Sequence, residues 1–123
     1  MPTKTQIQKE HDERLLNLAH AVARAYRYVC HTALQNLATT WLADWEELQG
    51  KEYLDDADDE WFEKRIQILL KLLTSSYNPE RKALLRALAH NVDSYASVVA
   101  HCPEEYFSKD IHARVADVLK DVL

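Results

Sequence analysis

Glycine is almost absent from this chain, since Gly50 is the single glycine in 123 residues, where about 7% would be usual. Glycine lets the backbone adopt positive φ angles and approach a ligand closely, and loops that wrap phosphates or form oxyanion holes depend on it. The sequence therefore excludes a P-loop, a dinucleotide-binding fingerprint and a nucleophile elbow. Any chemistry would have to come from side chains on helices.

Long apolar runs are also missing. No segment approaches the roughly 18 consecutive apolar residues of a membrane-spanning helix, and residues 1–14 lack the apolar stretch of a signal peptide. Cysteine is rare too: Cys30 and Cys102 form no close-spaced pair, which suits a reducing compartment where each is a small buried apolar side chain. We therefore expect a cytoplasmic protein that does not bind a membrane.

A helical pattern dominates the first part of the chain. Residues 3–49 contain neither glycine nor proline, and apolar residues recur there in nine steps over 33 residues, close to the helical period of about 3.6. The pattern predicts a helix over about 5–49, and its uninterrupted phase favours one continuous helix. A break near 31–40 stays open, because Thr32 with Gln35 could form a capping box and two adjacent threonines follow.

The rest of the chain carries three further helical patterns, the second of which opens with Asn78 as a cap and Pro79 in the first turn. These patterns predict helices at about 57–74, 79–101 and 104–122. The content of 47% apolar and 28% charged residues fits one globular domain. We predict an all-α fold, a single-domain helical bundle of four to five helices with a long N-terminal helix.

Four cationic or titratable residues form a stripe on the first predicted helix. His20, Arg24, Arg27 and His31 are spaced four, three and four apart, which places them on one side of a helix. Three interpretations stay open: a solvated helix face, pairing with acidic residues of the same chain, or a site for anions. For the last, arginines form charge-assisted forks with phosphates. We therefore treat these four as candidate anion or phosphate-binding residues.

Two members of this stripe also match a catalytic pattern. Arg24 and His31 have six residues between them, which resembles the R-x4-6-H motif of the helical ribonucleases called the HEPN family, over these eight residues. The resemblance implies that the histidine acts as acid or base at a 2′-hydroxyl while the arginine steadies the scissile phosphate, usually across a dimer. Ala25 stands where that family often has a polar residue, a departure that weakens this alternative.

Acidic residues gather in one part of the chain, residues 44–63, called the acidic segment from here on. It holds ten carboxylates and a single basic residue, Lys51, whereas the remaining chain has fourteen basic and ten acidic residues. Such a segment is either a solubilising linker with helix caps or a docking surface for a basic partner. Its aromatic residues can belong to the core or to an interface. The candidate partner-binding residues are Asp55, Asp56, Asp58, Asp59, Glu60 and Trp61.

Spacings typical of metal sites are missing: the sequence has no H-E-x-x-H, no E-x-x-H and no C-x-x-C. We predict no metal site, no cofactor and no catalytic residues. The function expected is non-enzymatic binding of a macromolecule through the acidic segment, as in an adaptor, an immunity or antitoxin-type protein, or a small subunit of a larger complex. A nucleic-acid-binding subunit that uses the cationic stripe is the alternative, followed by the HEPN-like ribonuclease. We expect a homodimer or a hetero-complex.

Overall fold

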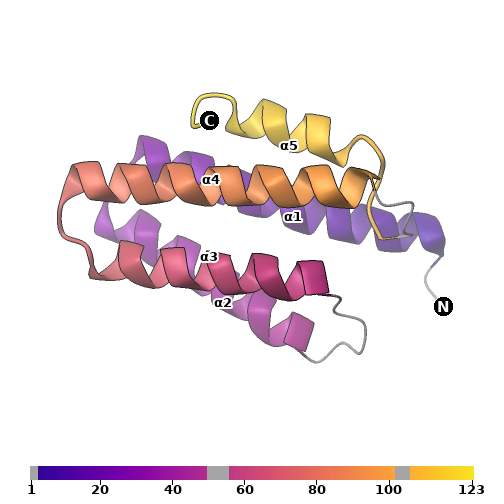
Figure 1. Ribbon diagram of the computed structural model, residues 1–123, viewed down its shortest axis with the longest axis horizontal. Coiled ribbons are helices and arrows are strands. Elements are labelled where there is room, and N and C mark those ends of the chain that lie inside the picture. The colour runs from indigo at the N-terminus through magenta and orange to yellow at the C-terminus, as the bar shows by residue number, and fades with distance from the viewer. Residues whose placement is uncertain (1–2, 50–55, 102–105) are drawn as a thin grey trace.

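Five helices follow one another along the chain, and the computed structural model describes residues 3–49, 56–101 and 106–123. The described residues contain no strand, so the fold is the predicted all-α single bundle with a long N-terminal helix (Figure 1). The helices are α1 (Lys4–Arg27), α2 (His31–Gln49), α3 (Asp56–Thr74), α4 (Asn78–His101) and α5 (Ile111–Leu119).

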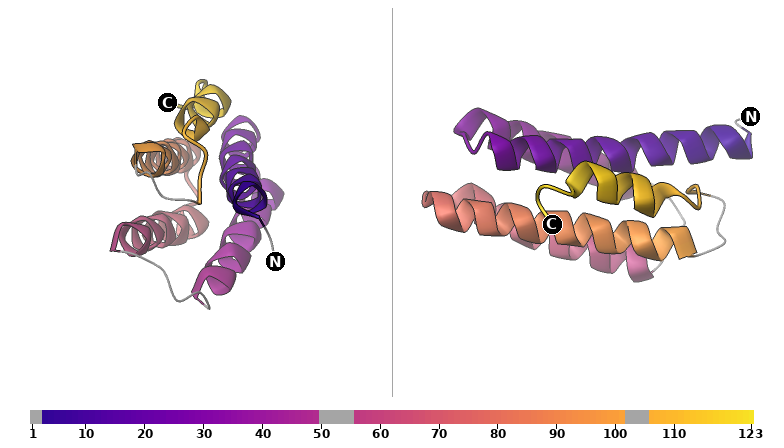
Figure 2. Two further views of the ribbon diagram at one scale, coloured as in Figure 1. Left: turned by 90° about the vertical axis from the view of Figure 1, so that its right-hand side faces the viewer. Right: turned by 90° about the horizontal axis from the view of Figure 1, so that it is seen from above.

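The first four helices run alternately up and down, and α5 lies along the seam between α1 and α4 (Figure 2). α1 contacts α2, α4 and α5, while α3 contacts α2 and α4. The turns after α1 and after α3 consequently lie at one end of the elongated molecule. The C-terminal ends of α2 and α4 lie at the other end, together with the start of α3.

The start of α1 is fixed by a capping box. The Thr3 hydroxyl accepts the Gln6 N–H at 3.2 Å, and the Thr3 N–H donates to Gln6 Oε1 at 2.9 Å. These bonds satisfy backbone donors that have no partner within the helix. The first helix therefore begins where its sequence can cap it.

The chain reverses direction at residues 28–30, so the continuous helix that the apolar phase favoured is wrong. Tyr28 takes φ −120° and ψ 73°, and the Cys30 N–H donates to the Tyr28 carbonyl at 2.7 Å. The Cys30 carbonyl then accepts the Leu34 N–H at 3.1 Å at the start of α2. No described residue has a positive φ, which explains why this reversal needs no glycine.

The predicted break region, 31–40, lies inside the continuous α2. Thr39 and Thr40 do not interrupt it, because each hydroxyl donates to the carbonyl four residues earlier at 2.9 Å. The reversal has a clear benefit, since a straight helix of about 45 residues would leave much of its apolar stripe in water. Folding back buries four α2 side chains against the common core, namely Leu34, Leu37, Ala38 and Trp41.

The last helix is shorter than predicted, Ile111–Leu119 in place of about 104–122. Residues 106–110 form turns. Within them the Ser108 N–H donates to Asp12 Oδ1 at 3.1 Å and its hydroxyl bonds to the other carboxylate oxygen of Asp12. These bonds fix the chain against α1 before α5 begins. α3 and α4 each begin one residue before their predicted starts.

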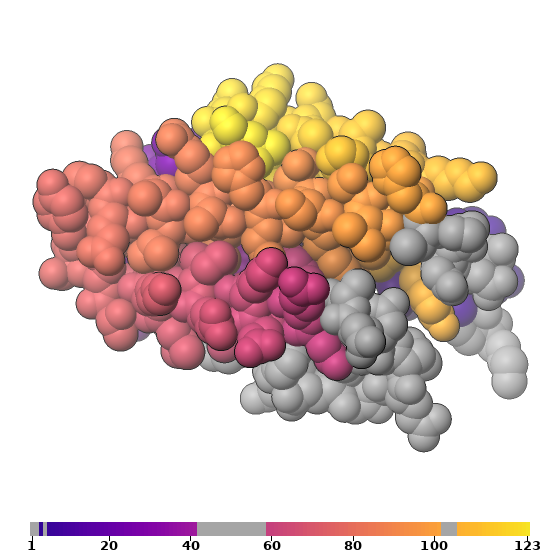
Figure 3. Space-filling model, viewed as in Figure 1, coloured from indigo at the N-terminus to yellow at the C-terminus, as the bar shows by residue number. Residues whose placement is uncertain are grey.

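All five helices contribute to one core of buried side chains. α4 and α5 supply several of its most completely buried residues, including Leu85, Leu88, Ile111, Val115 and Leu119. The space-filling view shows the coloured part of α3 packed along α4 on the face toward the viewer (Figure 3). Both tryptophans with described side chains, at positions 41 and 61, belong to this core.

Candidate functional site

A groove between α1 and the C-terminal part of the chain contains most of the cationic stripe. Its volume is about 470 Å³. Charged side chains line the groove on both sides. The cations come mainly from α1, and the carboxylates come from α5 and the turn after α5. The lining residues are His20, Ala23, Arg24, Arg27, Tyr28, Asp117, Val118, Lys120 and Asp121.

Charges in this groove are only partly paired. Arg27 Nη2 lies 3.1 Å from Asp121 Oδ2, and both side chains are more than half exposed, so this ion pair contributes little to stability. The side chains of His20, Arg24 and Lys120 make no hydrogen bond or ion pair within the part of the chain that the structure describes. The groove therefore offers three unpaired cationic or titratable groups to a ligand.

His31 lies apart from the rest of the stripe, because the reversal at residues 28–30 separates it from α1. It is the first residue of α2, it is exposed, and it does not line the groove. The structure thus brings together three of the four predicted anion-binding residues. The two residues of the HEPN-like pair, Arg24 and His31, lie on two different helices. The ribonuclease alternative stays a prediction from the sequence.

More cations gather near the groove, at the end of the bundle where α1 stops and α4 starts. Arg86 donates to the Tyr26 hydroxyl at 2.9 Å and to the Val122 carbonyl at 3.1 Å. Lys82 Nζ lies 5.7 Å from the centre of the Tyr26 ring, within reach of a cation–π contact. Carboxylates lie there as well, with Asp117 and Asp121 in the groove and Glu80 in the first turn of α4. We call the following set the basic end: Arg24, Arg27, Lys71, Arg81, Lys82, Arg86 and Lys120.

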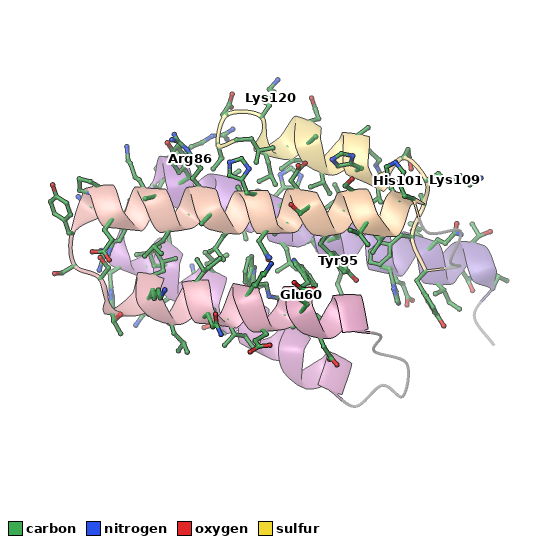
Figure 4. All side chains as sticks on the ribbon, in the orientation of Figure 1. Glu60, Arg86, Tyr95, His101, Lys109 and Lys120 are labelled. Atoms are coloured by element: carbon green, nitrogen blue, oxygen red, sulfur yellow. The ribbon has the colours of Figure 1, made fainter. Side chains whose placement is uncertain are left out.

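The acidic segment is described only in part. Asp55 lies outside the described residues, as do the side chains of Asp56 and Asp58. Asp59 and Glu60 are exposed in the first turns of α3, and Glu60 forms an ion pair with Lys64, one turn further along the helix, at 3.3 Å. Figure 4 shows Glu60 on α3 in the lower part of the bundle and Lys120 on the upper side.

Trp61 corrects the predicted set of partner-binding residues, because its indole is buried in the core. It stacks on Tyr95 of α4, with ring centres 3.9 Å apart and planes within 8°. It also tilts against Phe62, with centres 4.5 Å apart. Trp61 therefore joins α3 to α4 and does not present its ring on the surface.

Arg65 is a buried cation that the sequence alone did not single out. Its guanidinium carbon lies 4.5 Å from the ring centres of Trp41 and Phe62 and 4.6 Å from that of Trp61. One of its nitrogens donates to the Trp41 carbonyl at 3.3 Å. A cation–π environment of this kind is a structural arrangement that ties α2 to α3. A signal was present in the spacing, because Arg65 follows Trp61 by four residues, on the same helix face.

Asp12 is a second buried charge that was not anticipated from the sequence. Besides the two bonds from Ser108, its carboxylate lies 3.4 Å from Arg114 Nη1 of α5. It precedes Leu15 by three residues and so falls within the apolar stripe of α1. A carboxylate at a core position indicates a fixed partner, and here the partner is the start of α5.

The protein is thus a small helical bundle with a basic end, and the described side chains of the acidic segment lie in the first turns of α3. Comparison of the chain with protein-family models, with curated proteins and with solved structures found no match. No three His, Cys, Asp or Glu side chains among the described residues are placed to hold a metal ion. In that same part of the chain, no helix combines the length and the apolar content needed to cross a membrane.

Proposed function

We propose that the protein acts by binding another macromolecule, docking its acidic segment onto a basic surface of a partner protein. The roles that fit are those of an adaptor, an immunity or antitoxin-type protein, or a small subunit of a larger complex. No catalytic group is needed for any of them. The support for this proposal is electrostatic and comes from the described residues.

One observation carries the proposal: two arginines of α1, Arg24 and Arg27, are not neutralised by the described part of the acidic segment. Arg27 pairs with Asp121, beside α5, and α5 and α3 are not in contact among the described helices. Asp59, Glu60 and Glu63 are exposed at the start of α3. The carboxylates of Asp59 and Glu63 can therefore meet a partner, which would be steered toward them and held in register by complementary charge.

The test is capture of partners from a lysate of the native host. Changing Asp55, Asp56, Asp58 and Asp59 to lysine reverses the charge of the acidic segment. We expect this variant to lose the proteins that the wild type captures at about 0.15 M salt while its helical circular dichroism persists. Partners with basic surfaces should also leave the wild type as salt rises, because exposed charges are screened beyond about 8 Å at that ionic strength.

A matched control keeps the size of the charge change and moves its position. Asp59→Lys with Glu63→Lys changes two exposed carboxylates of α3, and Glu10→Lys with Glu13→Lys changes two exposed carboxylates of α1. Only the α3 pair should weaken capture. Equal capture by both pairs, or an unchanged set of partners with the fourfold variant, contradicts the proposal.

Binding of nucleic acid at the basic end is the second candidate function. The specific observation in its favour is the groove, where Arg24, His20 and Lys120 have no partner among the described residues. Tyr28 is exposed beside them and offers a ring on which a base can stack. The chain's formal net charge of −5 opposes such binding, but a local cationic surface can still bind phosphates.

Salt titration of binding to single-stranded RNA and DNA tests this candidate. Removing one cation that binds a phosphate should reduce the slope of log K against log salt by about 0.7 for a single strand. Arg24→Ala with Arg27→Ala should therefore flatten the slope by about 1.4. Lys64→Ala with Lys109→Ala, two exposed lysines outside the groove, is the control. A slope that the Arg24 and Arg27 changes leave intact refutes the phosphate site.

A further inference from the structure

The outer face of α3 carries an apolar stripe that no other described helix covers. Leu70 is 59% exposed, Leu73 40% and Tyr77, in the turn after α3, 66%. Ile66 on the same face is half-buried. Large side chains of this kind are normally scattered singly on a surface, and a contiguous group indicates a contact site. We call these four residues the α3 stripe.

The spacing of the α3 stripe suits pairing with another helix. Its three helical members, Ile66, Leu70 and Leu73, follow one another at intervals of four and three residues, the 3.5-residue repeat by which two helices pack side by side. Tyr77 continues the apolar surface just beyond the end of α3. The same repeat extends backward through Glu63 to Asp59, both exposed. The face is therefore acidic in its first turns and apolar in its remaining turns.

Charge determines which partner helix fits this face. The acidic first turns require cations opposite them, and the apolar turns require apolar side chains. A second copy of this chain supplies both when it runs in the opposite direction, because the α3 stripe leads directly to the basic end, where Lys71, Arg81 and Lys82 lie. A parallel arrangement would place carboxylates opposite carboxylates, which is destabilising.

We propose that two copies of this chain pair along the α3 stripe, antiparallel, about a two-fold axis near Leu70. Glu63 lies seven residues before Leu70 and Tyr77 lies in the turn just after α3, so this axis brings Glu63 of one copy toward the end of the stripe that carries Tyr77 of the other. Ile66 of each copy then meets Leu73 of the other. The contact is isologous, because the same surface is used on both copies, and it closes at two.

The dimer is expected to be weak and concentration-dependent. The face from Asp59 to Thr74 is about 24 Å long at 1.5 Å per residue. One helix face of this length buries less than the roughly 800 Å² on each partner that is usual in stable complexes. This pairing shares Asp59 and Glu63 with the proposed docking function, but it needs no other protein. Purified full-length protein is therefore sufficient to test it.

Sedimentation velocity from about 1 to several hundred micromolar gives the oligomeric state. The wild type should pass from monomer to dimer, and Leu70→Glu should raise the dissociation constant at least tenfold. Val98→Glu is the matched control, since Val98 is 47% exposed on α4, outside the stripe. Circular dichroism shows whether each variant is folded. A wild type that stays monomeric, an assembly larger than two, or equal effects of both changes overturns the proposal.

Cysteine cross-linking tests the direction of pairing. In a background of Cys30→Ser and Cys102→Ser, the two-fold axis places Leu70→Cys of the two copies within the roughly 7 Å between Cα atoms that a disulfide allows. Mild oxidation should then produce a covalent dimer. Glu63→Cys should not cross-link, because antiparallel copies hold these positions about 20 Å apart. Cross-linking at both positions indicates parallel pairing and overturns the antiparallel model.

Discussion

α5 and α2 are attached to the bundle in different ways. α5 has nine residues, yet Ile111, Val115 and Leu119 are fully buried between α1 and α4. α2 has nineteen residues and contacts α1 and α3 alone among the described helices. Over residues 32–41, where the side chains of α2 are described, its exposed positions are polar and uncharged: Thr32, Gln35, Asn36, Thr39 and Thr40.

Polar contacts strengthen this difference. The C-terminal part of the chain is joined to α1 and α4 through the Asp12 carboxylate, the Arg27 pair with Asp121, and the bond from Arg86 to the Val122 carbonyl. For α2, a bond of this kind to another helix runs from Arg65 to the Trp41 carbonyl. We therefore expect buried area and fixed polar partners, and not helix length, to determine how firmly α2 and α5 are held.

The largest effect is expected at the aromatic contact of α3, on which the attachment of α2 also depends. Trp61→Ala removes the stacking on Tyr95 and the ring beside Arg65, and should lower the free energy of unfolding by about 3–5 kcal/mol. Denaturation by urea measures this free energy. Trp61→Phe retains an aromatic ring and should cost less; an equal loss from both variants would show that the ring contacts are unimportant.

A somewhat smaller loss is expected when the attachment of α5 is broken. Asp12→Ala leaves the Ser108 N–H and Arg114 without their acceptor, and should cost about 2–3 kcal/mol, because hydrogen bonds to charged groups are the strong ones. Asp110→Ala is the control, since Asp110 is exposed and its side chain makes no capping bond. That change should stay within about 0.5 kcal/mol. Equal stability of the two variants would contradict the role assigned to Asp12.

Amide hydrogen exchange compares the two helices directly in the unmodified protein. We expect the amides around Leu37 in α2 to exchange at least about ten times faster than those around Leu88 in α4, a difference of about 1.4 kcal/mol in opening free energy. The amides around Val115 in α5 should follow α4. Slower exchange in α2 than in α5 would reverse the comparison.

The smallest effect is expected for the exposed ion pair at the groove. Arg27→Ala should change the free energy of unfolding by no more than about 1 kcal/mol, and Arg24→Ala, which has no partner among the described residues, should change it less. A double-mutant cycle of Arg27 with Asp121 measures the pair alone. A coupling of about 2 kcal/mol or more would mean that this pair is a structural attachment of α5 on the scale of Asp12.

Much of the fold could be predicted from the sequence because helical periodicity and caps are local properties. Asn78 with Pro79 marked the start of α4 to within one residue. The reversal at Tyr28 could not be predicted, since it uses ordinary negative φ values and the apolar phase continues through it. The late start of α5 depends on the bond between Ser108 and Asp12, which are 96 residues apart and therefore share no local pattern.

The candidate site was predictable in part. His20, Arg24 and Arg27 do share one helix face, as their spacing indicated, but the carboxylates of Asp117 and Asp121 that face them come from a distant part of the chain. Spacing within one helix cannot show which groups another helix brings opposite. Trp61 illustrates the same limit, because the aromatic and acidic residues around it are equally compatible with a surface and with a core.

The contacts between α1 and the C-terminal part of the chain have a consequence for folding during synthesis. Its polar bonds join residues 94 to 102 positions apart, so α1 cannot find these partners until nearly all of the sequence has left the ribosome. At about 5–20 residues per second, that delay is roughly 5–20 s. During this interval the apolar side of the first helix can be covered only by α2 and α4 or by a chaperone, which makes the nascent chain sensitive to the rate of translation.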